Sequence, residues 1–88
     1  MAILQVRGEV DLLTRDSFER TLDRGMETDG DLVLDLSELR FIDGAGLRGL
    51  ARTADRLDRQ GRRLSLDRPS PHLLRLLILV GLGRLAVR

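Results

Sequence analysis

A short glycine-containing segment carries the groups with which this chain could bind an anion or a partner. It reads Asp43-Gly44-Ala45-Gly46-Leu47 and joins an apolar run to an amphipathic stretch. Glycine lets the backbone turn sharply and lets another molecule approach closely. The first N–H groups of a helix have no partner within it, so they can receive a phosphate group. The segment therefore predicts either an anion site or a surface for protein recognition.

The glycine spacing is compatible with a dinucleotide-binding loop. Gly44, Gly46 and Gly49 match the G-x-G-x-x-G fingerprint, and Asp67 falls near the place of a ribose-binding acid. Asp43 counts against this interpretation because its carboxylate would face the pyrophosphate. A chain of 88 residues is also too short for two nucleotide-binding halves. We expect the glycines to serve the turn and close helix packing, and a nucleotide-binding fragment is the alternative.

Two further carboxylates, Glu9 and Asp11, could flank Asp43 but do not by themselves make an active site. Cysteine is absent, and His72 is the single histidine. A lone histidine binds metal poorly and needs a partner for acid–base chemistry. We therefore expect no catalytic residue, no metal site and no cofactor, and we do not expect an enzyme.

The composition is that of a small globular domain. Hydrophobic residues make up 42% of the chain, and the formal net charge is +1. This charge argues against non-specific nucleic-acid binding, and Phe18 and Phe41 are the only aromatic residues on which bases could stack. The longest apolar run is too short to span a bilayer, and the N-terminus lacks the pattern of a signal peptide. We expect a cytoplasmic domain without direct membrane insertion.

Strands and helices are predicted to alternate along the chain. The predicted strands cover residues 3–6, 32–36, 62–67 and 85–87, with a polar loop at 8–11 and a polar turn at 37–40. The predicted helices follow a Thr14 cap, run from about Gly46 to Gln60, and run from Pro71, after a Ser70 cap, to about Val80. This order predicts an α/β fold: a mostly parallel mixed sheet of about four strands with three packed helices.

Several of these segments together resemble the anti-sigma factor antagonist, or STAS, family. The resembling pieces are Gly8-Glu9-Val10-Asp11, Asp35-Leu36-Ser37, Phe41-Ile42-Asp43-x-x-Gly46-Leu47, Ser70-Pro71 and Gly81-Leu82. They run in order from about Leu4 to Val87. The resemblance implies a single STAS-like domain over residues 1–88, without the extra N-terminal strand and C-terminal helix that are usual in the family.

What the resemblance implies for function is partner switching in bacterial transcription regulation. Family members capture an anti-sigma factor, usually a GHKL-type protein kinase, and so free a sigma factor. Phosphorylation of a serine just before the motif's glycine releases the partner, because a dianion alters a surface shaped for a neutral hydroxyl. Here Gly44 and Ala45 stand where the two serines would be, and Ala45 cannot be phosphorylated. We therefore expect partner binding without the usual switch.

The docking surface implied by the resemblance is centred on the helix entry. Its expected residues are Glu9, Asp11, Asp43, Gly44, Ala45, Gly46, Leu47, Arg48 and Arg52. Arg48 and Arg52 continue to Arg56 at intervals of four residues, which predicts a basic stripe beside this entry. Asp55 and Asp58 would equally make the stripe an ordinary solvated face.

The third predicted helix carries apolar residues outside its core-facing stripe. Leu74, Ile78 and Leu79 are these residues, and they predict an apolar surface for a homodimer or another partner. The last strand or another segment could instead cover them. A binding surface here would suit the second function that the family suggests, a scaffold or subunit associated with a lipid or anion transporter.

Overall fold

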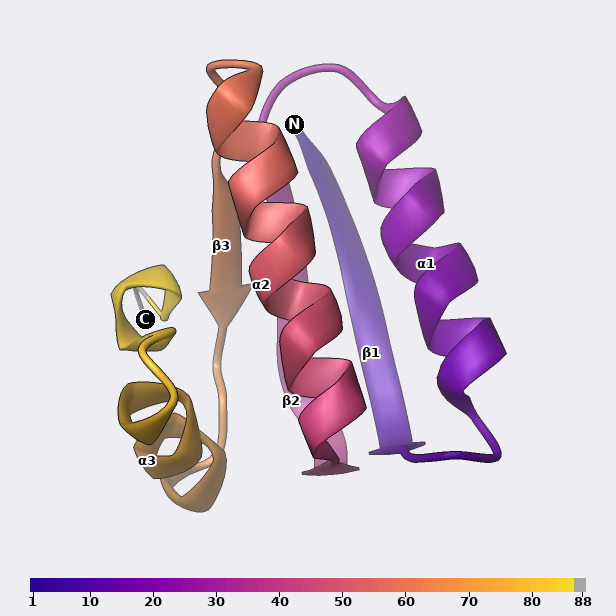
Figure 1. Ribbon diagram of the computed structural model, residues 1–88, viewed down its shortest axis with the longest axis vertical. Coiled ribbons are helices and arrows are strands. Elements are labelled where there is room, and N and C mark those ends of the chain that lie inside the picture. Colours follow the sequence, from indigo (N-terminus) through magenta and orange to yellow (C-terminus); the bar gives the residue numbers. More distant parts are fainter. Residues whose placement is uncertain (87–88) are drawn as a thin grey trace.

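The computed structural model describes residues 1–86, which form a parallel sheet covered by helices. The strands are β1 (Ala2–Val10), β2 (Leu32–Ile42) and β3 (Leu64–Asp67), and the helices are α1 (Arg15–Glu27), α2 (Gly44–Arg59), α3 (Pro71–Leu79) and a 3₁₀ helix, η1 (Gly83–Leu85). The sheet order is β1-β2-β3, and both strand pairs are parallel. Helices α1 and α2 lie side by side along β1 and β2, whereas α3 lies beyond the end of β3 (Figure 1).

The predicted α/β fold is confirmed, with three helices and three strands among the described residues. The predicted fourth strand is wrong where the structure describes it, because Leu85 ends η1 and Ala86 follows that turn. Val87, the last residue of that predicted strand, lies outside the described residues. All strands of residues 1–86 run parallel, so the described sheet is not mixed.

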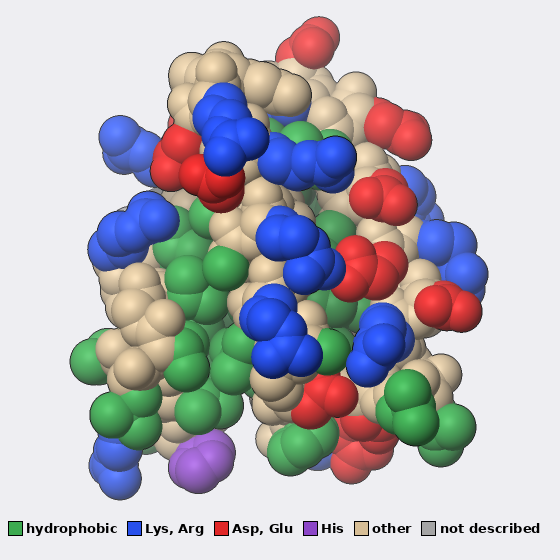
Figure 2. All heavy atoms as spheres, viewed as in Figure 1, with side chains coloured by type: hydrophobic (Ala, Val, Ile, Leu, Met, Phe, Trp, Pro, Cys, Tyr) green, Lys and Arg blue, Asp and Glu red, His purple; other side chains and the backbone are tan. Residues whose placement is uncertain are grey.

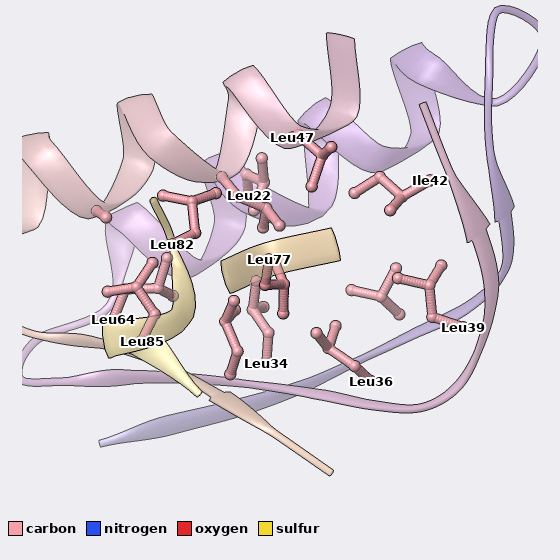
Figure 3. Packing of buried hydrophobic residues seen from close by; sticks show 14 of the residues in the cluster. Leu22, Leu34, Leu36, Leu39, Ile42, Leu47, Leu64, Leu77, Leu82 and Leu85 are labelled. Atoms are coloured by element: carbon pink, nitrogen blue, oxygen red, sulfur yellow. The ribbon is translucent and has the colours of Figure 1, made fainter. Parts of the chain in front are cut away.

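Leucine builds the core between the helices and one face of the sheet. Leu32, Leu34, Leu64 and Leu66 of the strands and Leu22, Leu50, Leu57 and Leu77 of the helices are almost completely buried. Figure 3 shows Leu77 of α3 and Leu34 of β2 pointing into the same interior. The opposite face of the sheet is much more open, since Ile3 is 63% exposed there. The helices therefore hold the sheet from one side.

Strands β1 and β2 are both longer than predicted. β1 continues through residues 8–10, which were expected to form a loop, and β2 continues through the expected turn at 37–40. The ladder between them shifts register twice, and at each shift β2 contributes an extra residue, as in a β-bulge. Polar residues at such irregular places resemble a turn in the sequence, although the strand continues.

A buried carboxylate supports the first of these bulges. Asp35 Oδ1 accepts a hydrogen bond from Ser37 N at 3.0 Å, and Asp35 Oδ2 accepts one from Arg68 Nη2 at 2.6 Å. These donors favour the ionised carboxylate, so the Ser37 N–H first, with Ser37's side chain and then Arg68, lowers the pKa of Asp35 below 3.8. The Asp-Leu-Ser part of the family motif thus shapes β2 rather than a binding surface.

Arg62 joins the end of α1 to the segment before β3. Its guanidinium donates to the carbonyl oxygens of Gly30 at 2.7 Å and Met26 at 3.1 Å, and also to those of Gly25 and Thr28. The last carbonyls of a helix lack partners within it, so a cation is favourable there. Arg62 thus holds the end of α1 instead of beginning a strand. β3 begins at Leu64 and not at residue 62 as predicted.

Candidate docking site at the start of helix α2

The site forms where the carboxyl ends of β1 and β2 meet the first turn of α2. Asp43 N donates to Val10 O at 2.9 Å, which holds the two strand ends together. Glu9 pairs with Phe41 in the ladder, so the acidic end of β1 lies beside the glycine-containing segment. Figure 1 shows both strand ends and the start of α2 at the same end of the molecule. The structure therefore brings together the two segments that the sequence placed in one site.

Asp43 caps helix α2 with its own side chain. Its Oδ1 accepts a hydrogen bond from Gly46 N at 2.8 Å, and its backbone is extended, as is usual for an N-cap residue. Helix α2 consequently begins at Gly44, two residues before the predicted Gly46. The carboxylate thus accepts a hydrogen bond from one of the N–H groups that a bound phosphate would use. It also places negative charge beside the other N–H groups of the first helical turn.

The glycines of this segment have different roles. A Cβ on Gly46 would lie 2.6 Å from Ile42 Cγ1 and 2.8 Å from Val10 Cγ1, so only glycine fits between the strand ends and the helix. A Cβ on Gly49 would lie 3.3 Å from Glu19 Oε1 of α1, which is also close packing. Gly44 is exposed, and a Cβ there would meet only Arg48 Nη1 at 3.4 Å. Close packing thus accounts for Gly49, as predicted, and also for Gly46, which was predicted to serve the turn.

The predicted docking residues divide into an accessible group and a supporting group. Gly44 is exposed, and Asp43 and Ala45 are half-buried, so a partner can reach all three. Gly46 is buried, and Leu47 is 8% exposed and belongs to the core. Gly46 and Leu47 therefore position the segment, while Asp43, Gly44 and Ala45 form its surface.

The basic stripe is present along the outer side of α2. Arg48, Arg52 and Arg56 are exposed, and Figure 2 shows a column of basic side chains over this helix. Arg52 Nη2 lies 3.3 Å from Glu19 Oε1 of α1, whereas Asp55 pairs with Arg59. Among the described residues Arg48 forms no ion pair, so its charge remains available beside Gly44.

The β1–α1 turn shows the roles of Glu9 and Asp11, the two acids predicted to flank Asp43. Asp11 Oδ1 accepts hydrogen bonds from Leu13 N at 3.0 Å and Thr14 N at 3.2 Å, so this carboxylate is used to shape the turn. The Thr14 hydroxyl donates to Glu9 O at 2.7 Å and makes no capping bond to α1, unlike the predicted cap. Glu9 is exposed and is the carboxylate of this pair that faces solvent.

Three exposed apolar side chains at this end were not predicted as site residues. Leu12 is 75% exposed, Leu13 is 92% exposed, and Phe41 is 52% exposed. Leu12 and Leu13 are presented by the Asp11 turn, and Phe41 stands two residues before Asp43. The sequence did contain a signal for this exposed apolar surface. Leu12 and Leu13 stand next to each other between Asp11 and Thr14, and neither belongs to the apolar stripe of a helix.

The apolar residues of α3 lie at a separate place. Ile78 is 60% exposed and Leu79 is 78% exposed, and Val80 beside them is also exposed, while Leu74 is half-buried. Helix α3 packs on the core through Leu73 and Leu77, and η1 follows it. The described end of the chain therefore leaves Ile78 and Leu79 uncovered.

The described part of the chain offers no arrangement for metal binding or membrane crossing. No group of three or more His, Asp or Glu side chains among residues 1–86 is placed to hold a metal ion. None of the helices described is long and apolar enough to cross a membrane.

The fold and this site define a STAS domain. Residues 1–87 match the sequence family described as "Mlab, STAS domain", and the chain belongs to that family. No curated protein sequence matches the chain significantly.

Solved structures of two different STAS proteins share the fold. The STAS domain of a SulP transporter from Vibrio cholerae is 21% identical, with a TM-score of 0.71 over 97% of this chain and 66% of that chain. The anti-sigma factor antagonist SpoIIAA in its unphosphorylated form is 20% identical, with a TM-score of 0.73 over 96% of this chain and 76% of that chain. The chain is thus similar in fold to a transporter domain and to an antagonist alike, and spans slightly less than two thirds of the former.

Proposed function

We propose that this chain is a protein-docking domain that binds its partner at the start of α2 without a phosphorylation switch. The observation that carries the proposal is the surface of that segment. It consists of exposed Gly44 and half-buried Ala45 beside the free charge of Arg48. Ala45 lacks a hydroxyl, so phosphorylation cannot release a partner from this position.

The partner we propose first is an anti-sigma factor of the GHKL kinase type, in bacterial transcription regulation. The order of motif pieces in the sequence and the fold shared with the antagonist SpoIIAA support this partner. Asp43, Gly44 and Ala45 would form the centre of the contact, with Arg48 and Glu9 at its rim. A cytoplasmic location follows from the same proposal.

The second candidate partner is a membrane transporter, of which this chain would be a cytoplasmic scaffold or subunit. The fold shared with the STAS domain of a SulP transporter favours it. The exposed apolar residues Ile78 and Leu79 would suit a lasting association, since uncovered apolar surface often marks an interface.

A nucleotide-binding or catalytic role is not part of our proposal. Asp43 holds Gly46 N, and its charge would oppose a pyrophosphate at the helix start. Titration of the ¹⁵N-labelled chain with NAD and with ATP tests this point. We expect no saturable shift at residues 44–49, and such a shift would restore the nucleotide-binding alternative.

The experiment that tests the proposal is affinity capture with ATP present, comparing the wild type with Ala45→Ser. We expect the wild type to retain a GHKL-type kinase and to stay unphosphorylated by mass spectrometry. The Ser variant should be phosphorylated at residue 45 and should lose the kinase. Capture of a transporter subunit instead would favour the second candidate, and phosphorylation of the wild type with loss of its partner would contradict the absence of a switch.

A further inference from the structure

One edge of the central strand is left without a neighbour over half its length. β1 pairs with β2 from Leu32 to Ile42, but β3 pairs only with residues 32–35. Figure 1 shows β3 ending well before β2 does, with α3 lying beyond the end of β3. Residues 36–42 of β2 therefore have no neighbouring strand on the β3 side within the described chain.

Helix α3 turns this open edge into a groove. The groove is lined by residues 39–42 of β2 and, on the other side, by Ser70, His72, Leu73 and Leu76, and it encloses about 80 Å³. A water molecule occupies about 30 Å³ of liquid, so the groove has room for one aliphatic side chain. Phe41, Leu73 and Leu76 supply its apolar surface.

The backbone at this edge faces the groove. Asp43 N donates to Val10 O of β1, and the peptide groups of successive strand residues point to opposite edges. The peptide groups of Ile42, which precedes Asp43, are therefore directed away from β1 and toward the side where α3 lies. Ile42 is 4% exposed overall and lines the groove. Peptide groups that have no partner at a strand edge can pair with an added extended segment.

Arg40 places a positive charge at the rim of the groove. Arg40 and His72 are both exposed and line it, and none of the lining residues is acidic. An incoming segment with acidic side chains would gain favourable interactions at the rim, while its apolar side chain fills the space beside Phe41. A basic segment would be repelled by Arg40.

We propose that this groove binds an extended peptide segment of a partner protein, with apolar and acidic residues alternating, as an added strand on the free edge of β2. Backbone hydrogen bonds would supply affinity, and alternate side chains would supply selectivity, as in other cases of strand addition. The groove is contiguous with the α2 site because Ile42 adjoins Asp43. The inference goes beyond the proposed function, since it holds whichever of the two partner classes is correct.

The test begins with a random twelve-residue peptide library displayed on phage and selected against the whole chain. The enriched peptides are synthesised and titrated into the ¹⁵N-labelled protein. We expect alternating apolar and acidic residues in the enriched sequences, and saturable amide shifts at residues 39–42 and at His72. N-methylation of alternate peptide amides should weaken binding at least tenfold, because it removes the donors needed for strand pairing.

A charge reversal supplies the matched control. Arg40→Glu should weaken the acidic peptides at least tenfold and should strengthen versions in which their acids are replaced by arginine. Arg20→Glu, at an exposed position of α1 outside the groove, should change the affinity of neither the acidic peptides nor their arginine versions. Both positions are exposed, so both variants should fold.

Four results would overturn the inference. In the first, no peptide binds more tightly than 1 mM. In the second, the peptides shift residues 43–48 or 78–80 instead of the groove. The third is an Arg40→Glu variant that binds the peptides as the wild type does. The fourth is a set of groove shifts that grow with protein concentration alone, which would mean that a second copy occupies the edge.

Discussion

At the scale of single residues, Gly46 is the position at which the site depends most on the absence of a side chain. Gly44→Ala and Gly46→Ala form a matched pair, since both lie in the first turn of α2. We expect Gly46→Ala to lower the free energy of unfolding by about 1–3 kcal/mol, because its Cβ would overlap Ile42 and Val10. Gly44→Ala has space and should be neutral or stabilising by up to about 1 kcal/mol, through alanine's higher helix propensity. Denaturant unfolding measures both, and equal effects would contradict the packing explanation.

Asp35 makes stability depend on pH in a predictable direction. Its pKa in the folded chain is lowered below 3.8, so it stabilises the fold at neutral pH, and this contribution is lost as pH falls through the folded-state pKa. We expect Asp35→Asn to unfold at lower denaturant concentration than the wild type at pH 7. The difference should shrink below about pH 3.8.

Asp23→Asn is the control for this prediction, since Asp23 is exposed on α1 and forms no described ion pair. It should leave stability nearly unchanged at either pH. A difference between wild type and Asp35→Asn that is the same at pH 7 and pH 3 would show that the ionised carboxylate is not what supports the β2 bulge.

At the scale of elements, Arg62 determines how firmly the end of α1 is held. Arg62→Ala removes donors from Gly25, Met26, Thr28 and Gly30 carbonyls at once. We expect a loss of about 1.5–3 kcal/mol in the free energy of unfolding, as for hydrogen bonds to charged groups, and faster amide exchange at residues 25–30. Arg63→Ala is the neighbouring control, because the exposed Arg63 bonds through its backbone alone: its N–H donates to Asp31 Oδ1, and its carbonyl oxygen accepts from Leu32 N. Equal effects of both variants would contradict this role.

The helices could be predicted from the sequence more accurately than the strands. Helical periodicity, the Ser70 cap and the stop at Gly61 predicted α2 and α3 to within two residues, because these signals are local. The continuation of β1 and β2 could not be predicted in this way. Their polar residues lie on bulged or open parts of the sheet, and pairing with a distant strand overrides the local appearance of a turn.

The same distinction holds for the site. Asp43 and its glycines could be found because a cap and its helix are adjacent in sequence. Leu12, Leu13 and Phe41 become part of one surface only when the ends of β1 and β2 are brought together, and this depends on the register of the sheet. Arg62 likewise reaches carbonyls more than 30 residues away, which no local pattern announces.

At the scale of the whole molecule, the leucine core and the proposed docking surface lie in different parts of the fold. The helices bury a leucine core against one face of the sheet. The end at which β1 and β2 finish carries the exposed side chains of Leu12, Leu13 and Phe41, together with the α2 entry and Arg48. The basic column over α2 in Figure 2 runs from this end. A partner that docks at this end needs no rearrangement of the core.

The measurement that tests the account most directly is the affinity of the captured, purified partner for two arginine variants of α2. Ala45→Arg places a large side chain in the proposed contact, whereas Ala51→Arg places the same side chain at an exposed position farther along the helix. We predict binding weakened more than tenfold, or about 1.4 kcal/mol, for Ala45→Arg, and unchanged binding for Ala51→Arg, with both variants as helical as the wild type. Unchanged affinity of the folded Ala45→Arg variant would contradict docking at the start of α2.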